Sequence, residues 1–379
     1  MGRKDEKNKS SSTKKKKRVS RKELLRRKQR RNKIIILAAV AAAVILAVMF
    51  IPKLTAVFQE NSQNVSERGV VLEDVDISEL KHLSFDILSV ESSDTRMSAE
   101  EFSEALIQLY NDGYVLVDVY DIVNISEDGS FSYKDTISIP EGKRPLIISQ
   151  SDVCYPMNSQ ESGVADKLVL DNGQIKAQYT NASGSVLTGD YDLVPVLESF
   201  IESHADFSFE GARAILGVNG STGVFGYRTT SFFSGTENNP YADYGTFDTE
   251  RETEDAANIA DKLKELGYHF ACYGFSDEIS YGAEYSIVES DIEQWKEEVV
   301  PVTGETDIII LPKQTDIGSW SGYDSDNRKY ELLSENGFKF YFVGNNATPN
   351  LLQIRDGYVR QTVYEVHTGI DFENAKAWL

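Results

Sequence analysis

From about Val71 onward, segments whose apolar residues have strand spacing alternate with segments whose apolar residues have helical spacing. In the segment MSAEEFSEALIQLYNDGY, Ser98 and Glu101 have the spacing of a capping box, and Gly113 suits the end of a helix. The apolar face of this segment consists of Phe102, Ala105, Leu106 and Leu109. The next segment, VLVDVYDI, alternates apolar and polar residues as a strand does. These patterns predict a helix followed by a strand.

The same alternation continues to about residue 344. RPLIIS predicts a strand, and KLVLDNGQIKAQY predicts a hairpin with Asn172-Gly173 as its type I′ turn. Helix–strand pairs follow in YDLVPVLESFIESH with GARAILGV, EDAANIADKLKELG with YHFACYGF, and NRKYELLSENG with FKFYFVG, and TDIIILP is a further apolar strand. Strands that alternate with helices indicate a mostly parallel sheet, either open or closed into a barrel. The sequence has no dinucleotide-binding glycine motif, no Walker A motif and no GxSxG motif.

A run of 18 uncharged apolar residues, 34–51, precedes this part of the chain. At ~1.5 Å per residue it nearly crosses a ~30 Å hydrocarbon core, and it is longer than most signal-peptide cores. We therefore expect an uncleaved transmembrane anchor, with a cleavable signal peptide as the alternative. Residues 52–70 are polar and predict a stalk, and residues 71–379 form the main predicted domain.

Charge is divided sharply along the chain. Residues 1–33 carry 17 Lys and Arg against 3 Asp and Glu, which leaves 22 basic and 57 acidic residues for the remainder. The positive-inside rule places the basic tail in the cytoplasm and the acidic domain outside, as a single-pass protein of the cell membrane. A basic tail can bind nucleic acid, but beside an apolar span it is better explained as a topology signal. The acidic domain is unsuited to nucleic acid.

Cysteine and histidine are both scarce. The two cysteines form no C-x-x-C motif, and the four histidines, His82, His204, His269 and His367, form no close pair. A histidine-rich zinc site therefore cannot be assembled from one local segment.

The order of segments over about residues 78–345 resembles the polysaccharide deacetylases of the NodB-homology type, carbohydrate esterase family four. MSAEEFSEALIQLYNDGYVLVDVYDI resembles the family's opening helix and strand. The segments that resemble its three motif-bearing regions are IPEGKRPLIISQSDVCY, KLKELGYHFACYGFSD and ETDIIILPKQTDIGSW. The resemblance implies a distorted (β/α) barrel of about seven strands, with its site at the C-terminal ends of the strands.

Most of the family's catalytic residues differ in this chain. The resemblance places the metal-binding aspartate at Asp152 and the catalytic base at Ser151, which cannot accept a proton near neutral pH. It places the two metal-binding histidines at Tyr273 and Asp277, and the amide that holds the oxyanion at Lys313. Only Asp152 and the proline before Lys313 keep the family's residue type.

These differences imply loss of the family's chemistry. One carboxylate and a phenol of pKa ~10 are poor ligands for zinc, and loss of a general base alone costs a factor of ~10² to 10⁴. We therefore expect no metal cofactor. Asp152, Asp277 and Glu278 could instead form an all-oxygen site for Ca²⁺ or Mg²⁺, although acids in such a domain are usually solvated. We expect His269 to be an ordinary strand residue rather than a ligand, and His367 is the only histidine late enough for a closing role.

The resemblance also implies that Cys154 and Cys272 lie on strand ends that converge on the same mouth. A disulfide across that mouth is one expectation, and two buried thiols are the other. The glycine-rich loops GSWSGY and GVFGYR hold aromatic residues that could line a glycan groove, but we favour packing onto the barrel.

Two functions remain open from the sequence. The first is a membrane-anchored, catalytically impaired deacetylase-like protein that binds envelope polysaccharide or peptidoglycan, or acts as a scaffold. The alternative is an active deacetylase that removes N- or O-acetyl groups with a divergent site for zinc or a similar metal.

Overall fold

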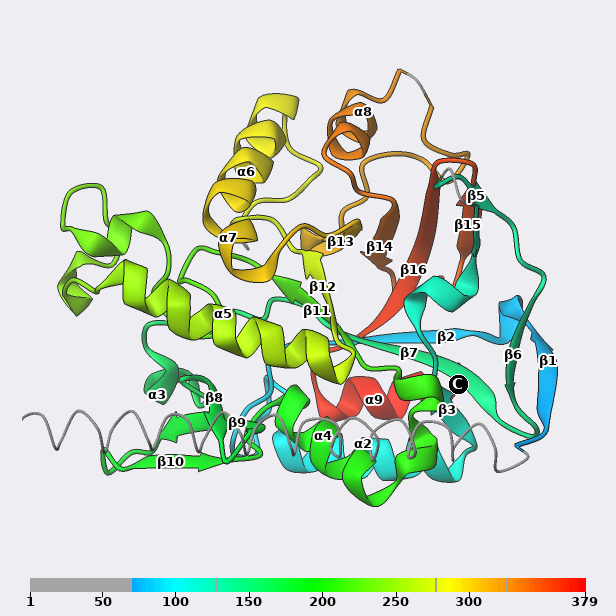
Figure 1. Cartoon of the computed structure of the whole chain (residues 1–379), viewed down its shortest axis with the longest axis horizontal. Helices are drawn as coiled ribbons and strands as arrows, with labels where there is room; N and C mark the ends of the chain where they lie inside the picture. The colour runs from blue at the N-terminus through cyan, green and yellow to red at the C-terminus, as the bar shows by residue number, and fades with distance from the viewer. Residues whose placement is uncertain (1–69, 127–128, 277, 325) are drawn as a thin grey trace, which may run out of the picture. The chain divides into compact units, whose positions relative to one another are not determined.

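Seven parallel strands close into a barrel at the centre of the protein, whose structure is a computed structural model (Figure 1). It describes residues 70–126, 129–276, 278–324 and 326–379. The barrel strands, in order, are β11 (Ile215–Val218), β12 (His269–Cys272), β13 (Ile308–Leu311), β14 (Phe340–Gly344), β16 (Tyr358–Val366), β2 (Lys81–Phe85) and β7 (Arg144–Gln150). Pairing of β11 with β7, Ile215 opposite Ser149, closes the ring. The predicted barrel is therefore confirmed, including its strand number.

Smaller strands extend this barrel at its edges. Outside the ring, β3 (Tyr114–Leu116) pairs in parallel with β7, and β15 (Leu352–Arg355) pairs antiparallel with β16. Separate antiparallel pairings join β1 (Leu72–Asp76) to β6 (Thr136–Pro140), β4 (Asn124–Ile125) to β5 (Phe131–Ser132), and β8 (Lys167–Asp171) through β9 (Gln174–Thr180) to β10 (Val186–Gly189). The predicted hairpin is present between β8 and β9, where Asn172 and Gly173 both have positive φ, as a type I′ turn requires.

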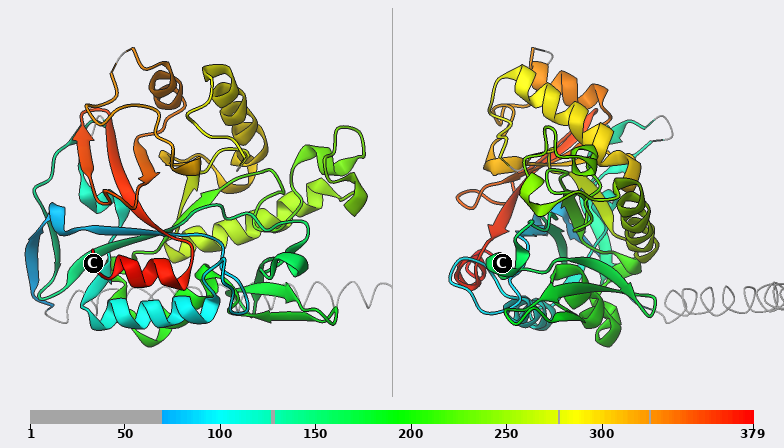
Figure 2. Two further views of the ribbon diagram at one scale, coloured as in Figure 1. Left: turned by 180° about the vertical axis from the view of Figure 1, so that it is seen from behind. Right: turned by 90° about the vertical axis from the view of Figure 1, so that its left-hand side faces the viewer.

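Helices flank the outside of the barrel, as both views in Figure 2 show. The longer helices are α2 (Ala99–Asn111), α4 (Leu193–Ser203), α5 (Thr249–Leu266), α6 (Tyr285–Glu298), α8 (Arg328–Glu335) and α9 (Gly369–Ala375), and the short ones are α3 (Ser159–Ser162) and α7 (Val300–Thr303). The predicted capping box at Ser98 and Glu101 begins α2, and Gly267 ends α5 in the left-handed conformation. The segment VLVDVYDI differs from its prediction, since Val119–Ile122 forms a 3₁₀ turn that Asp118 caps.

Alternation along the strands divides the apolar core into two layers. Inward-facing side chains such as Ile147, Ala271, Ile310 and Phe342 fill the barrel, and outward-facing ones such as Leu146 pack against the helices.

A polar group also lies inside the barrel, on three neighbouring strands. His82 of β2 hydrogen-bonds to Gln361 of β16 at 3.1 Å and to Ser149 of β7 at 3.0 Å. Burial lowers the pKa of His82 to about 4. This histidine is therefore neutral at physiological pH, and its two ring nitrogens are satisfied by neutral partners.

Residues Val71–Leu379 form one compact unit. The predicted basic tail (1–33), transmembrane anchor (34–51) and most of the stalk (52–70) lie outside the described residues. Among the helices that the structure does describe, none is both long and apolar enough to cross a membrane.

Candidate functional site

The mouth of the barrel, defined as the C-terminal ends of its seven strands, brings together residues from distant parts of the chain. Following the alternation of each strand, the inward-facing positions at the mouth are Asp86, Ser151, Asn219, Tyr273, Pro312, Gly344 and Glu365. His367 follows directly after β16. Polar residues cluster on the β16–β2–β7 side of this ring, and the β12 and β13 positions are a tyrosine and a proline.

Asp86 is the centre of the polar cluster. The hydroxyl of Ser151 donates to Asp86 Oδ1 at 3.1 Å, and His367 Nδ1 lies 2.6 Å from Asp86 Oδ2. On its other side, His367 Nε2 lies 3.7 Å from Glu365 Oε2. The hydrogen bond to Asp86 and then the ion pair with Glu365 raise the pKa of His367 to about 10. His367 is therefore an imidazolium at neutral pH and cannot serve as a general base for Ser151.

Glu365 is buried beneath this pair of charges, with 8% of its surface exposed. A Cβ atom on Gly344 of the neighbouring strand would overlap the Glu365 carboxylate, so glycine at this position makes room for it. Ser84 is the residue of β2 that pairs with Glu365 in the sheet. Among the described residues, neither Ser84 Oγ nor Glu365 Oε2 has a hydrogen-bond partner within 3.5 Å, so the ion pair with His367 is the main compensation for burying the carboxylate.

Asp152 lies beside this cluster in an unusual backbone conformation. Its φ is 56°, in the left-handed region, and its carboxylate accepts a hydrogen bond from the Asn219 side chain. The backbone on its C-terminal side is held by β11, because Val153 N donates to Gly217 O at 2.7 Å. Asp152 is thus held toward β11 by its amide partner.

A buried carboxylate holds the segments around Ser151 and Asp152 in place. Asp192 accepts hydrogen bonds from Leu88 N at 3.1 Å, Gln150 Nε2 at 2.9 Å and the Tyr155 hydroxyl at 2.5 Å. Burial raises the pKa of Asp192, and these three donors act in the opposite direction. Asp192 therefore ties the loop after β2 to both sides of the mouth segment after β7.

The structure describes two of the other positions that the resemblance assigned to catalysis, Tyr273 and Lys313. Tyr273 packs against the apolar interior of the barrel, and Lys313 is an exposed residue with a left-handed φ of 57°. Asp277 lies outside the described residues. Asp152 and Tyr273 offer one carboxylate, which already accepts from Asn219, and one phenol, and this donor set does not fit zinc. No group of three or more His, Cys, Asp or Glu among the described residues could hold a metal ion.

The disulfide that the resemblance left possible between Cys154 and Cys272 is not formed in the structure. Cys154 Sγ lies 2.6 Å from the Thr222 hydroxyl, whereas Cys272 is fully buried and its sulfur accepts from Gly274 N at 3.3 Å. Burial raises the pKa of the Cys272 thiol. The physical reason is the alternation of β12: Cys272 faces the outer helices, and only the next residue, Tyr273, faces the barrel interior.

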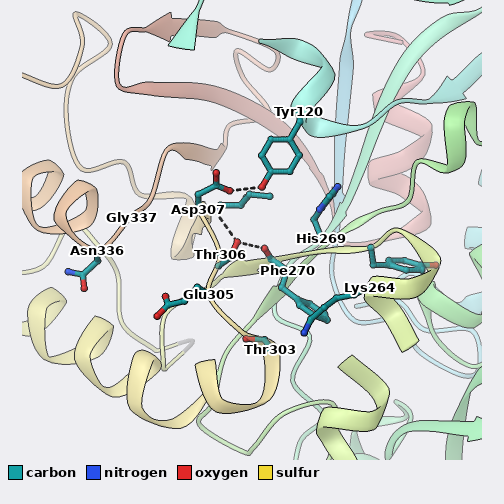
Figure 3. Close-up of a pocket in the computed structure, with 12 residues that line it drawn as sticks. Tyr120, Lys264, His269, Phe270, Thr303, Glu305, Thr306, Asp307, Asn336 and Gly337 are labelled. Carbon is teal, nitrogen blue, oxygen red and sulfur yellow. Dashed lines mark hydrogen bonds between the residues drawn. The ribbon is translucent and has the colours of Figure 1, made fainter. Parts of the chain in front are cut away.

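His269 lies at the opposite end of the barrel from the mouth, as the first residue of β12. There it pairs with Asp118, with 2.7 Å between His269 Nε2 and Asp118 Oδ2. The expectation that it is an ordinary strand residue is confirmed. An open cavity of about 470 Å³ lies beside it. Two of the residues that line this cavity are joined by a hydrogen bond, in which the Tyr120 hydroxyl donates to Asp307 at 2.6 Å (Figure 3). This cavity shares no residue with the mouth.

No family model matches the chain, and no curated protein matches it. Solved structures that resemble it are polysaccharide deacetylases, the family that the sequence resembles. The Streptococcus pyogenes deacetylase PplD in complex with acetate has 9% identity and a TM-score of 0.38 over 80% of this chain and 98% of its own. A polysaccharide deacetylase from Bacillus cereus has 10% identity and a TM-score of 0.40, over 80% of this chain and 69% of its own.

A de-N-acetylase from Aggregatibacter actinomycetemcomitans has 13% identity and a TM-score of 0.40, with coverage of 79% of this chain and 99% of its own. Likenesses at these TM-scores do not establish what the mouth does. The function proposed below therefore rests on the residues of the barrel itself.

Sequence reasoning missed Asp86 and Glu365, two of the four residues that form the polar cluster. A signal for Asp86 was present, because HLSFD is a strand-like run that ends in an aspartate, as LIISQSD does at Asp152. Glu365 gave no such signal, because it lies inside the strand segment that the sequence pattern left unassigned. His367 was singled out only by its late position, and the structure places it in the mouth.

Proposed function

We propose that this protein is a membrane-anchored, deacetylase-like barrel that binds a cell-envelope glycan at its mouth without hydrolysing it. The observation that carries the proposal is the cluster of Asp86, Ser151, Glu365 and His367. His367 is paired with both carboxylates and Ser151 donates to Asp86, so no neutral imidazole is left beside the hydroxyl.

Deacetylation requires a group that takes a proton from the attacking oxygen, a contribution of ~10² to 10⁴ in rate. The Ser151 hydroxyl donates a hydrogen bond to the Asp86 carboxylate, and His367 is already protonated because two carboxylates flank it. The hydroxyl therefore lacks the neutral imidazole that activates a serine nucleophile. These contacts support binding more strongly than hydrolysis.

The exposed parts of the same cluster are suited to sugar hydroxyls. The side chains of Asp86 and His367 are 34% and 40% exposed, and Asp152 on the neighbouring strand end is partly exposed. Carboxylates accept hydrogen bonds and an imidazolium donates them, so together they match the mixed donor and acceptor character of a hydroxyl group. An envelope polysaccharide or peptidoglycan is the partner that this surface and the external location favour.

The test measures metal, turnover and binding on the same full-length preparation. The protein, purified in detergent, is dialysed against trace Zn²⁺, Co²⁺ and Mn²⁺ and analysed for bound metal, then assayed for acetate release from acetylated chitin and peptidoglycan fragments. We expect no stoichiometric metal and no acetate above the blank, with retention on at least one of these glycans. One equivalent of metal that disappears in Asp152→Ala, together with acetate release, would establish the active deacetylase instead.

Binding at the mouth is tested with Asp86→Asn, which removes the charge that holds His367 and keeps the size of the side chain. We expect glycan retention to fall by about tenfold, since a charge-assisted contact contributes ~1.5–3 kcal/mol. Glu104→Gln, an equivalent change at an exposed position of α2, is the control and should bind as the wild type does. Equal retention by both variants would rule out the mouth as the binding surface.

Anchoring is tested separately. Full-length protein should remain with the membrane after alkaline carbonate extraction, and a variant that lacks residues 34–51 should be released. Protease added to intact cells should cleave the acidic domain and leave the basic tail. Recovery of the wild type in the soluble fraction would contradict the anchor.

A further inference from the structure

A second cavity, of about 420 Å³, lies on the outside of the barrel at the turn between β15 and β16. It is formed by three segments: residues 321–324 of the loop after β13, Tyr330 of α8, and the turn at 355–358. Figure 1 shows α8 and the β15–β16 turn at one edge of the domain. Its volume is within the ~300–1,000 Å³ of sites that hold small molecules.

The floor of this cavity, which we call the tyrosine pocket, is built of Tyr323, Tyr330 and Tyr358. Ring centroids are 5.2 Å apart for Tyr323 and Tyr330, and 5.3 Å apart for Tyr330 and Tyr358. Tyr358 is fixed by its hydroxyl, which accepts from Tyr323 N at 2.9 Å and donates to Gln353 at 2.8 Å. The packing that we favoured for the GSWSGY loop is confirmed, since Tyr323 is buried. The aromatic floor is therefore rigid before any ligand arrives.

Tyr330 differs from the other two tyrosines of the floor. It is half-buried, and its hydroxyl makes no hydrogen bond to any residue that the structure describes. Gly357 lies against that hydroxyl, and a Cβ atom there would come within 3.1 Å of it. A ring with an open side and an unused hydroxyl offers a ligand both a stacking surface and a polar contact.

Charged groups at the rim of the pocket are not paired with one another. Arg355 donates only to the backbone oxygen of Ile354, at 3.2 Å, and forms no ion pair among the described residues, although Asp324 and Asp356 line the same cavity. One guanidinium and two carboxylates can together donate to and accept from a ligand with several hydroxyl groups. Their net negative charge, in a strongly acidic domain, disfavours an anionic ligand.

We propose that the tyrosine pocket binds one unit of a neutral saccharide, with a sugar face packed on Tyr330 and hydroxyl groups held by Arg355 and the two aspartates. This inference rests on the proposed function, because it assumes that the protein binds a glycan. The pocket is a separate contact from the mouth. Glu365 lies seven positions after Tyr358 on β16, about 23 Å along a strand.

The test titrates full-length protein with an N-acetylated chitin oligosaccharide and measures affinity by calorimetry. Tyr330→Ala should weaken binding about tenfold, since an aromatic contact and its buried area together contribute ~1.5 kcal/mol. Tyr330→Phe, which keeps the ring, should retain most of the affinity, and Arg355→Ala should weaken binding several-fold. Tyr133→Ala is the control, because Tyr133 is 58% exposed and lies outside the pocket.

The outcomes separate this inference from the proposed function. Wild-type affinity in both Tyr330→Ala and Arg355→Ala, with binding lost in Asp86→Asn, would overturn the pocket and leave the mouth as the binding surface. Absence of binding by the wild type would overturn both. If Tyr330→Ala does not fold, Arg355→Ala and Gly357→Val, which places a side chain against the Tyr330 hydroxyl, decide the question.

The ligand class has its own test. A polyuronate of similar length should bind at least tenfold more weakly than the neutral oligosaccharide at low ionic strength, where repulsion by the two aspartates is least screened. Equal or tighter binding of the polyuronate would overturn the assignment of a neutral saccharide.

Discussion

His367 directly follows β16 at the mouth, and His82 lies in the interior on the neighbouring strand β2, yet their surroundings shift their pKa values in opposite directions. Two carboxylates hold His367 as a cation and raise its pKa to about 10, whereas burial among neutral partners lowers the pKa of His82 to about 4. In the interior, His82 therefore makes hydrogen bonds to neutral side chains, whereas at the mouth His367 forms an ion pair that is partly exposed. Substitutions in the two regions should therefore have different consequences.

The largest effect is expected for Phe342→Ala in the interior. Phe342 is fully buried, and its ring meets the edge of His82 with 4.7 Å between centroids. Loss of the ring should lower the free energy of unfolding by about 3–5 kcal/mol, measured by urea denaturation. Leu187→Ala, at a position that is 41% exposed, is the control and should change it by less than ~0.5 kcal/mol. Similar losses for both variants would remove the distinction between core and surface.

His82→Leu should have the next largest effect, about 2–3 kcal/mol, because Gln361 and Ser149 each lose a buried partner. It also removes a pH dependence. Below pH 6.5 this histidine is protonated in the unfolded chain, whereas in the folded protein it stays neutral down to about pH 4. Wild-type stability therefore falls as pH drops through this range.

The variant should lack that part of the acid sensitivity, which urea denaturation between about pH 4 and pH 7 measures. An unchanged acid profile in His82→Leu would show that this histidine is charged in the folded protein. The contrast between interior and mouth would then fail.

Gly344→Ala tests the mouth by steric means. The added methyl group would overlap the Glu365 carboxylate, and the rearrangement should cost about 1–3 kcal/mol in unfolding free energy. It should also lower the pKa of His367, because the second carboxylate moves away, and NMR titration of the imidazole measures this shift. Gly235→Ala, where a Cβ would meet nothing within 4 Å, is the matched control. A stable variant with an unshifted His367 would contradict the arrangement described here.

The smallest effect is expected for His367→Gln. The stability that His367 contributes is complete below pH 6.5 and is lost as pH rises toward 10, opposite in sign to His82. Because its side chain is 40% exposed, solvent screening should keep the contribution small. Wild type should lose more stability than His367→Gln between about pH 6 and pH 9, as measured by urea denaturation. Parallel losses would show that the flanking carboxylates do not stabilise the imidazolium.

The strands that the sequence predicted and the strands that it missed differ in their inward-facing residues. The strands β7, β13 and β14 are apolar runs, IIIL and FYFVG among them, and their pattern is unmistakable. The strands β2 and β16 place His82, Ser84, Gln361 and Glu365 inside the barrel. Such residues break the hydrophobic pattern, and His82 and Gln361 are tolerated there because neighbouring strands supply hydrogen-bond partners for them. The missed strands are therefore the ones that carry most of the polar cluster.

The sequence by itself determined what depends on neighbours along the chain: the capping box of α2, the Asn172-Gly173 turn and the apolar strands. Only the tertiary structure decided which strand ends meet. Asp86 and His367 are 281 residues apart in sequence, and they touch because β16 and β2 are neighbours in a closed barrel. Strand order depends on burial and closure of the whole sheet, so no local pattern around either residue could predict the pair.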